Sequence, residues 1–237
     1  MTKLGILVAM AVECRSLTSK RVPAGGCLDL GDGCLIGLSG AGPQAAQRCS
    51  ALLVEAGATS LISWGCAAAL APGHNPGDLI LPAGIVCTDG QLIDTDGEWR
   101  ERLSSKLDRQ MSVHTGLLAE SDRIVAGQEE KRDLFAATGA IALDMESAAA
   151  ARTAVRFRLP FLAVRSIIDP AEVSLPPSIH AAFDENGMLH VPQMLLRSLL
   201  HPTDFVDIIR LGRHFSAAMK TLSLAAAIGR DTYFAVT

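Results

Sequence analysis

Short, almost wholly apolar segments recur along the chain and alternate with amphipathic ones. Apolar runs of this length, bounded by turn residues, predict buried strands. They cover residues 4–10, 34–38, 60–64, 78–87, 113–118, 140–144 and 161–168. Apolar residues at helical spacing between Pro43 and Gly57 predict a helix, because proline favours the first turn and glycine the far end. Similar patterns predict helices at 97–110, 128–138, 147–158, 191–200 and 204–228.

This alternation predicts an α/β fold with a mixed, twisted central sheet flanked by helices. The glycine-rich stretch at 25–33 predicts a hairpin, and residues 65–70 are predicted to form a loop. The strand–helix–strand unit over 140–168 predicts parallel strands with a right-handed crossover. We expect a single domain over residues 1–237, with a helical extension at about 190–230 packed on it.

The composition indicates which binding partners and which cellular compartment to expect. Of the 237 residues 49% are hydrophobic and 19% charged, and the net charge is -4. Without a basic run, nucleic acid is not the expected partner. The six cysteines form no C-x-x-C pair and no cluster with zinc spacing, so we expect no structural metal and a reducing cytoplasmic compartment. No leader or membrane-spanning stretch is predicted. His74 is interpreted as a turn residue, and the histidines of the C-terminal region as non-ligands (His180, His190, His201 and His214).

Carboxylates follow several of the predicted buried strands. Glu146 and Asp169 come at the ends of two consecutive apolar runs, and Glu13 follows the first run. A helix cap or structural ion pair is the commoner explanation for one such acid, but a bare buried charge is costly. Ligands in α/β proteins bind outside the carboxyl ends of strands, so the three acids are candidates for one site. Arg165 lies within an apolar run and needs a carboxylate partner, for which Asp144 and Glu146 are the candidates.

A glycine-rich loop precedes the helix predicted after Pro43. Gly40-Ala-Gly-Pro-Gln-Ala45 fits the dinucleotide-binding pattern only weakly, because the next strand ends Ser63-Trp64-Gly65 without the acid that holds a ribose. An oxyanion held by backbone N–H groups and a tight turn that requires glycine both remain open.

Taken in order, these motifs resemble the superfamily of purine nucleoside phosphorylases and methylthioadenosine/S-adenosylhomocysteine nucleosidases. The matching segments are Gly5-Ile-Leu-Val-Ala-Met-Ala-Val-Glu13, Ser39-Gly-Ala-Gly42, Gly65-Cys-Ala-Ala-Ala-Leu70 with Gly77-Asp78, Asp144-Met-Glu146 and Arg165-Ser-Ile-Ile-Asp169. Further segments are similar to the hopanoid-associated phosphorylases: Asp144-Met-Glu-Ser147, Asp169-Pro170, Leu175-Pro-Pro177, Asp184-Glu-Asn-Gly187, Leu195-Leu-Arg-Ser-Leu-Leu200 and Leu211-Gly-Arg213. The resemblance implies a nucleoside phosphorylase-like fold.

The resemblance also implies an activity and a set of site residues. The expected reaction is cleavage of the N-glycosidic bond of a 5′-substituted adenine nucleoside, adenosylhopane in the closest subfamily, with release of adenine. Asp169 would protonate the purine, and Glu13 would act beside the nucleophile. Met145 and Glu146 would hold the ribose, and Asp144 would belong to the substrate-binding residues. Cys66 and Ala67 would lie along the base and ribose, and Ile124 and Val125 would stack on the base. Ser39, Gly40 and Gly42 would hold phosphate or the nucleophile. Asp169 is expected to be protonated near neutrality and Glu146 ionised.

The resemblance leaves open whether water or phosphate is the nucleophile. Hexameric bacterial phosphorylases carry an arginine at the position of Ser63, and a carboxylate at Glu13 resembles the nucleosidase pattern, so the residues favour water. The subfamily resemblance favours phosphorolysis, with inorganic phosphate as co-substrate and no other cofactor; hydrolysis of methylthioadenosine, S-adenosylhomocysteine or a futalosine-like nucleoside is the alternative. The subfamily resemblance further implies a lipid-linked nucleoside as partner and transient contact with the inner face of the membrane, whereas the resemblance to the nucleosidases implies a homodimer.

Overall fold

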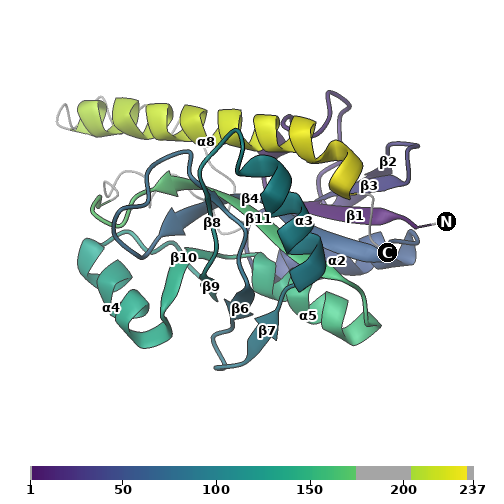
Figure 1. Cartoon of the computed structure of the whole chain (residues 1–237), viewed down its shortest axis with the longest axis horizontal. Helices are drawn as coiled ribbons and strands as arrows, with labels where there is room; N and C mark the ends of the chain where they lie inside the picture. The colour runs from purple at the N-terminus through teal and green to yellow at the C-terminus, as the bar shows by residue number, and fades with distance from the viewer. Residues whose placement is uncertain (1, 175–203, 234–237) are drawn as a thin grey trace.

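The computed structural model describes residues 2–174 and 204–233, with the side chains of 209–229 in the last helix (Figure 1). The strands are β1 Leu4–Val8, β2 Gly26–Asp29, β3 Cys34–Leu38, β4 Ser60–Ala69, β5 Leu79–Ile80, β6 Gly84–Val86, β7 Leu92–Asp94, β8 Val113–His114, β9 Leu117–Glu120, β10 Ala140–Asp144 and β11 Phe161–Asp169. The helices are α1 Ala11–Cys14, α2 Pro43–Glu55, α3 Gly97–Leu107, α4 Gln128–Thr138, α5 Ser147–Phe157 and α8 Asp204–Tyr233. The predicted helix at 191–200 lies outside the described residues.

All the strands belong to one mixed sheet, and β4 is at its centre. The main strand order is β2-β3-β1-β4-β10-β9-β6-β7. β4 also pairs in parallel with β11, which continues through β5 to β8. Its first half pairs with β1 and its last residues pair with β10. β4 therefore brings the ends of β1, β10 and β11 to one region of the sheet.

Helices cover both faces of the sheet (Figure 1). Successive side chains of a strand point to opposite faces. Ile6 and Val8 of β1 pack in a cluster with side chains of α3 and α8, whereas Leu7 packs with side chains of α2 and α5. The long helix α8 lies along the top of the view in Figure 1 and packs on β11 and α3. The predicted α/β class with a mixed, helix-flanked sheet is confirmed.

Three strand predictions are corrected by the structure. Residues 113–118 were predicted as one strand, but β8 ends at His114 and β9 begins at Leu117. Residues 65–69 were predicted as loop, but they continue β4 to Ala69, because β11 and β10 pair with this stretch of small residues. Residues 78–87 were predicted as one strand, but β5 ends at Ile80 and β6 begins at Gly84. Pro82 lies between them and has no N–H to donate to a neighbouring strand, which explains the interruption.

The strand–helix–strand unit over 140–168 also differs from its prediction. β10 and β11 each pair with β4, β10 in the antiparallel and β11 in the parallel sense, so they are not parallel neighbours. The crossover rule applies to parallel strands and does not govern this connection. In the part of the chain that the structure describes, no helix has both the length and the apolar character that crossing a membrane requires.

Candidate functional site

Glu13 is buried beside the middle of β4 and is held by main-chain donors. It lies on α1, directly after β1, and is 2% exposed. Its Oε1 accepts a hydrogen bond from the Cys66 amide at 2.8 Å, and its Oε2 accepts one from the Met10 amide at 3.0 Å. Burial raises the pKa of Glu13, and the Arg165 guanidinium opposes this rise. The carboxylate is thus fixed in position by the backbone of two separate elements.

Arg165 pairs with Asp144, one of the two partners expected from the sequence. Arg165 Nε lies 2.5 Å from Asp144 Oδ2, and both side chains are 2% exposed. The guanidinium also donates to Ser63 Oγ at 2.5 Å. Asp144 Oδ2 in turn accepts from Ser147 Oγ at 2.6 Å, at the start of α5. Although burial alone lowers the pKa of Arg165, the surrounding carboxylates of Asp144, Glu146 and Glu13 raise it overall.

Glu146 lies between this ion pair and the glycine-rich loop. It precedes α5 as its N-cap residue, and its Oε1 accepts a hydrogen bond from the Gly42 amide at 2.8 Å. Burial and the neighbouring Asp144 raise the pKa of Glu146 to about 7, although Arg165 opposes them. The sequence predicted an ionised Glu146, but in this structure the proton is more tightly held. The Gly42 N–H, predicted to face phosphate or the nucleophile, is bonded to this carboxylate.

Asp169 forms a second buried ion pair, with a residue that the sequence did not reveal. Lys131 Nζ lies 2.7 Å from Asp169 Oδ2, and the lysine side chain is 0% exposed. The same ammonium donates to the carbonyl oxygens of Pro170 at 2.9 Å and Val173 at 2.8 Å. Burial raises the pKa of Asp169 to about 6, against the lowering effect of Lys131. The predicted upward direction is therefore found, but the carboxyl is largely ionised at neutral pH.

The two ion pairs lie along β4 at a short distance from each other. In the register of the sheet, Arg165 is opposite Gly65 and Asp169 is opposite Ala68. Three residues of a strand span about 10 Å, which a nucleoside can bridge with its ribose at one end and its base at the other. The carboxylates predicted from strand ends are thus brought together in one region, as expected.

The remaining predicted residues differ in how accessible they are. Ala67 is buried in the core, and Val125 packs in a cluster with Leu70 and Leu143. Partly exposed side chains or backbone remain at the other predicted positions: Ser39, Gly40, Gly42, Cys66, Ile124 and Met145. Burial and the Glu13 carboxylate raise the pKa of the Cys66 thiol well above its usual range, so this side chain is a neutral thiol.

Lys131 and Ser147 are the residues of this region that sequence reasoning missed. Lys131 lies in the run Gln128-Glu-Glu-Lys-Arg-Asp133, which is typical of an exposed helix and gave no sign of a buried ammonium. Ser147 follows Glu146 directly, and a serine at the start of a predicted helix could have been recognised as a partner for Asp144.

Comparison with known proteins gives the family. Residues 28–197 match the model of the phosphorylase superfamily. A segment of 57 residues is 37% identical to the 5′-methylthioadenosine/S-adenosylhomocysteine nucleosidase of Thermotoga maritima, covering 24% of this chain and 26% of that protein. The match thus spans about a quarter of the length of this curated relative.

Solved structures share the fold over nearly the whole chain. The methylthioadenosine/S-adenosylhomocysteine nucleosidase of Helicobacter pylori superimposes with a TM-score of 0.69 at 19% identity, covering 98% of this chain and 97% of that chain. The futalosine hydrolase of the same organism gives 0.68 at 18% identity, with coverage of 98% and 97%. The S-adenosylhomocysteine nucleosidase of Streptococcus pyogenes gives 0.65 at 22% identity, with coverage of 94% and 96%. Because the family model covers residues 28–197, more than half of the sequence, the chain belongs to the phosphorylase superfamily.

Proposed function

We propose that this protein cleaves the N-glycosidic bond of a 5′-substituted adenine nucleoside and releases adenine. Membership of the phosphorylase superfamily and the fold shared with nucleosidases support the reaction class. The observation that carries the proposal is the grouping of Glu13, Glu146 and Asp169 along β4, each buried and each held by a separate donor.

In this proposal one acid binds the ribose and another acts on the purine. Glu146, with Met145 beside it, accepts hydrogen bonds from the ribose hydroxyls. Asp169 donates a proton to the purine, which gains negative charge as the bond to the ribose breaks. A positioned proton donor of this kind contributes about 10²–10⁴-fold to a rate. Arg165 pairs with Asp144 and limits the repulsion among the carboxylates around it.

We propose water as the nucleophile: its oxygen bonds to C1′ of the ribose as the bond from C1′ to the purine nitrogen breaks, and Glu13, which orients the water, takes up its proton. A phosphate ion would meet the carboxylates of Glu13 and Glu146, and the guanidinium of Arg165 is already bonded to Asp144 and Ser63. The Gly42 amide, a potential phosphate donor, is bonded to Glu146. Like charges in a water-excluded site repel strongly, which disfavours a phosphate here. Methylthioadenosine, S-adenosylhomocysteine and futalosine-like nucleosides are the corresponding substrates.

Phosphorolysis of a lipid-linked nucleoside such as adenosylhopane is the second candidate. It is favoured by the segments Asp144-Met-Glu-Ser147 and Asp169-Pro170, which resemble hopanoid-associated phosphorylases. The loop with Gly40 and Gly42 also leads into the N-terminus of α2, where backbone N–H groups attract oxyanions. Contact with the membrane surface stays a prediction that accompanies this candidate, and the homodimer stays a prediction based on the nucleosidases.

Product analysis separates the two reactions. The protein is incubated with methylthioadenosine, S-adenosylhomocysteine, futalosine and adenosylhopane, each with and without inorganic phosphate. We expect free purine at the same rate in both buffers, together with a free 5′-substituted ribose. Purine release that depends on phosphate and yields a ribose 1-phosphate would establish the second candidate. If no nucleoside releases its base under either condition, the proposed reaction class is wrong.

Gly65 offers a test of the position of Glu13. A Cβ at residue 65 would lie 2.7 Å from Glu13 Oε1, so alanine must displace the carboxylate. We expect Gly65→Ala to slow purine release by about 10²-fold, the cost typical of a catalytic group misplaced by ~1 Å. The measurement is the steady-state rate, with circular dichroism to verify folding. Gly212→Ala is the matched control, because a Cβ there meets nothing within 4 Å and a helical alanine is favourable. A wild-type rate in a folded Gly65→Ala protein would contradict the role of Glu13.

A further inference from the structure

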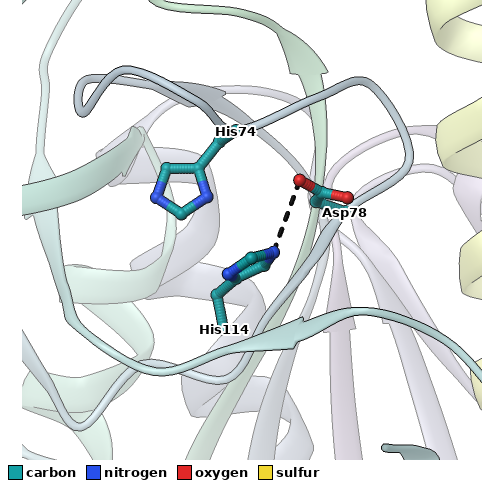
Figure 2. Close-up of side chains that lie close together, drawn as sticks. All are labelled: His74, Asp78 and His114. Carbon is teal, nitrogen blue, oxygen red and sulfur yellow. Dashed lines mark ion pairs between the residues drawn. The ribbon is translucent and has the colours of Figure 1, made fainter.

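Three side chains that commonly bind metals, none of them an acid of the proposed active site, lie together in the structure. His74 comes from the loop between β4 and β5, Asp78 directly precedes β5, and His114 ends β8 (Figure 2). One nitrogen of each imidazole and one oxygen of the carboxylate all lie within 4.8 Å of one another. His74 and Asp78 are close in sequence, but His114 lies far along the chain, so the spacing of ligands along the chain could not reveal the whole group.

Both imidazoles have a shielded nitrogen without a hydrogen-bond partner. His74 Nδ1 and His114 Nε2 are shielded from solvent and have no hydrogen-bond partner among the described residues, although the Asp78 carboxylate lies 3.4 Å from His114 Nε2. The two rings meet edge to face, with centroids 4.6 Å apart. Buried polar atoms are normally paired, and an unpaired one is costly. A cation that accepts both lone pairs would remove this cost.

The spacing and the surroundings suit a small divalent ion. His114 Nε2 lies 3.4 Å from Asp78 Oδ2, and a tetrahedral ion with bonds of ~2.1 Å separates its ligands by about 3.4 Å. Asp78 Oδ2 also accepts a hydrogen bond from the Asn75 amide at 2.8 Å, which orients the carboxylate as outer partners of metal ligands do.

We propose that His74, Asp78 and His114 form a binding site for a divalent transition-metal ion such as Zn²⁺, with water in the remaining positions. Imidazole and carboxylate donors together select Zn²⁺, Co²⁺ or Ni²⁺ over Mg²⁺, which prefers oxygen alone. The ion would fasten the loop that carries His74 to β8. Because Gly77 and Asp78 exchange backbone hydrogen bonds with Ile167 at 2.8 and 2.9 Å, the clamp would also stabilise the end of β11 that leads to Asp169.

Co²⁺ is the direct probe of this site, because its visible spectrum reports the ligands that it binds. The wild-type protein should bind Co²⁺ in equilibrium dialysis, with visible bands and no thiolate charge-transfer band. His74→Ala/His114→Ala should bind it more than about tenfold more weakly. His214→Ala is the matched control, since this histidine lies on α8 and is not a member of the group, and it should bind like the wild type. Wild-type affinity in the double variant, or a thiolate band in the wild type, would overturn the proposal.

Hydrogen exchange of the wild type gives a second readout that does not require a folded variant. Zn²⁺ should slow exchange of the backbone amides of residues 73–78 and 113–114, and raise the midpoint of thermal unfolding, because an ion that binds the native state stabilises it. Mg²⁺ at the same concentration should do neither. Equal protection by both ions, or protection confined to other segments, would show that the three side chains form only the ion pair between His114 and Asp78.

Discussion

Asp169→Asn is expected to release purine about 10²–10⁴-fold more slowly than the wild type, because asparagine keeps the shape of the side chain but has no proton to donate to the base. The measurement is kcat with saturating nucleoside. The pH dependence should change as well. In the wild type kcat/KM should fall as pH rises through about 6, where the Asp169 carboxyl ionises. The residual rate of the variant should lack this fall.

Lys131 supplies the control that separates proton donation from structural support. Asp169→Asn leaves the buried ammonium of Lys131 without its anion, which destabilises the fold as well. Lys131→Met breaks the same ion pair but keeps the carboxyl. Because the ammonium lowers the pKa of Asp169, its removal should move the fall of kcat/KM to higher pH. If the two variants lost the same rate and the same stability, Asp169 would serve the structure alone, and its role as acid would be wrong.

The overall fold follows from apolar periodicity, but the extent of the strands at three places does not. Most of β4 beyond Trp64 consists of glycine and alanine, which have low strand propensity and were predicted as loop. These residues form a strand because β11 and β10 flank them, and pairing between distant segments overrides local preference. The long run before Cys87 shows the reverse case, since its apolar pattern is continuous but Pro82 interrupts the pairing.

The part of the candidate site that could be predicted from the sequence is its charged residues in apolar segments, because a buried charge needs a partner. Asp144 and Arg165 are charged residues in apolar surroundings, so their pairing was foreseeable, and the structure confirms it. Lys131 gave no such signal, because a lysine among other charged residues of a helix is normally solvated. Its burial results from the turn after β11, which brings the carbonyl oxygens of Pro170 and Val173 over α4.

The pKa values of Glu146 and Asp169 depend on surroundings that the sequence does not reveal. Sequence reasoning gave Glu146 the ionised role and Asp169 the protonated one, which requires environments that separate their pKa values. In the structure both values are raised, Glu146 to about 7 and Asp169 to about 6. Ribose hydroxyls that donate to Glu146 would lower its pKa, and a purine acceptor beside Asp169 would favour the protonated acid. The separation is therefore expected to depend on the nucleoside itself.

Arg165→Met is expected to lower the free energy of unfolding by about 3–5 kcal/mol, the largest stability effect among these variants. The substitution leaves Asp144 buried without its cation, next to the carboxylates of Glu13 and Glu146. It also removes the donor to Ser63 Oγ. Chemical denaturation at neutral pH measures the change.

Two comparisons identify the cause of this loss. Arg152→Met breaks an ion pair with Glu120 in which the arginine is 36% and the glutamate 6% exposed. It should cost less than Arg165→Met, because the Thr88 amide and hydroxyl still donate to the Glu120 carboxylate. Adding Asp144→Asn to Arg165→Met should restore part of the stability, since it removes the uncompensated charge. If the double variant is as unstable as Arg165→Met, lost packing and not the unpaired carboxylate accounts for the effect. A loss in Arg165→Met no larger than in Arg152→Met would mean that Arg165 does not hold the acids of the site together.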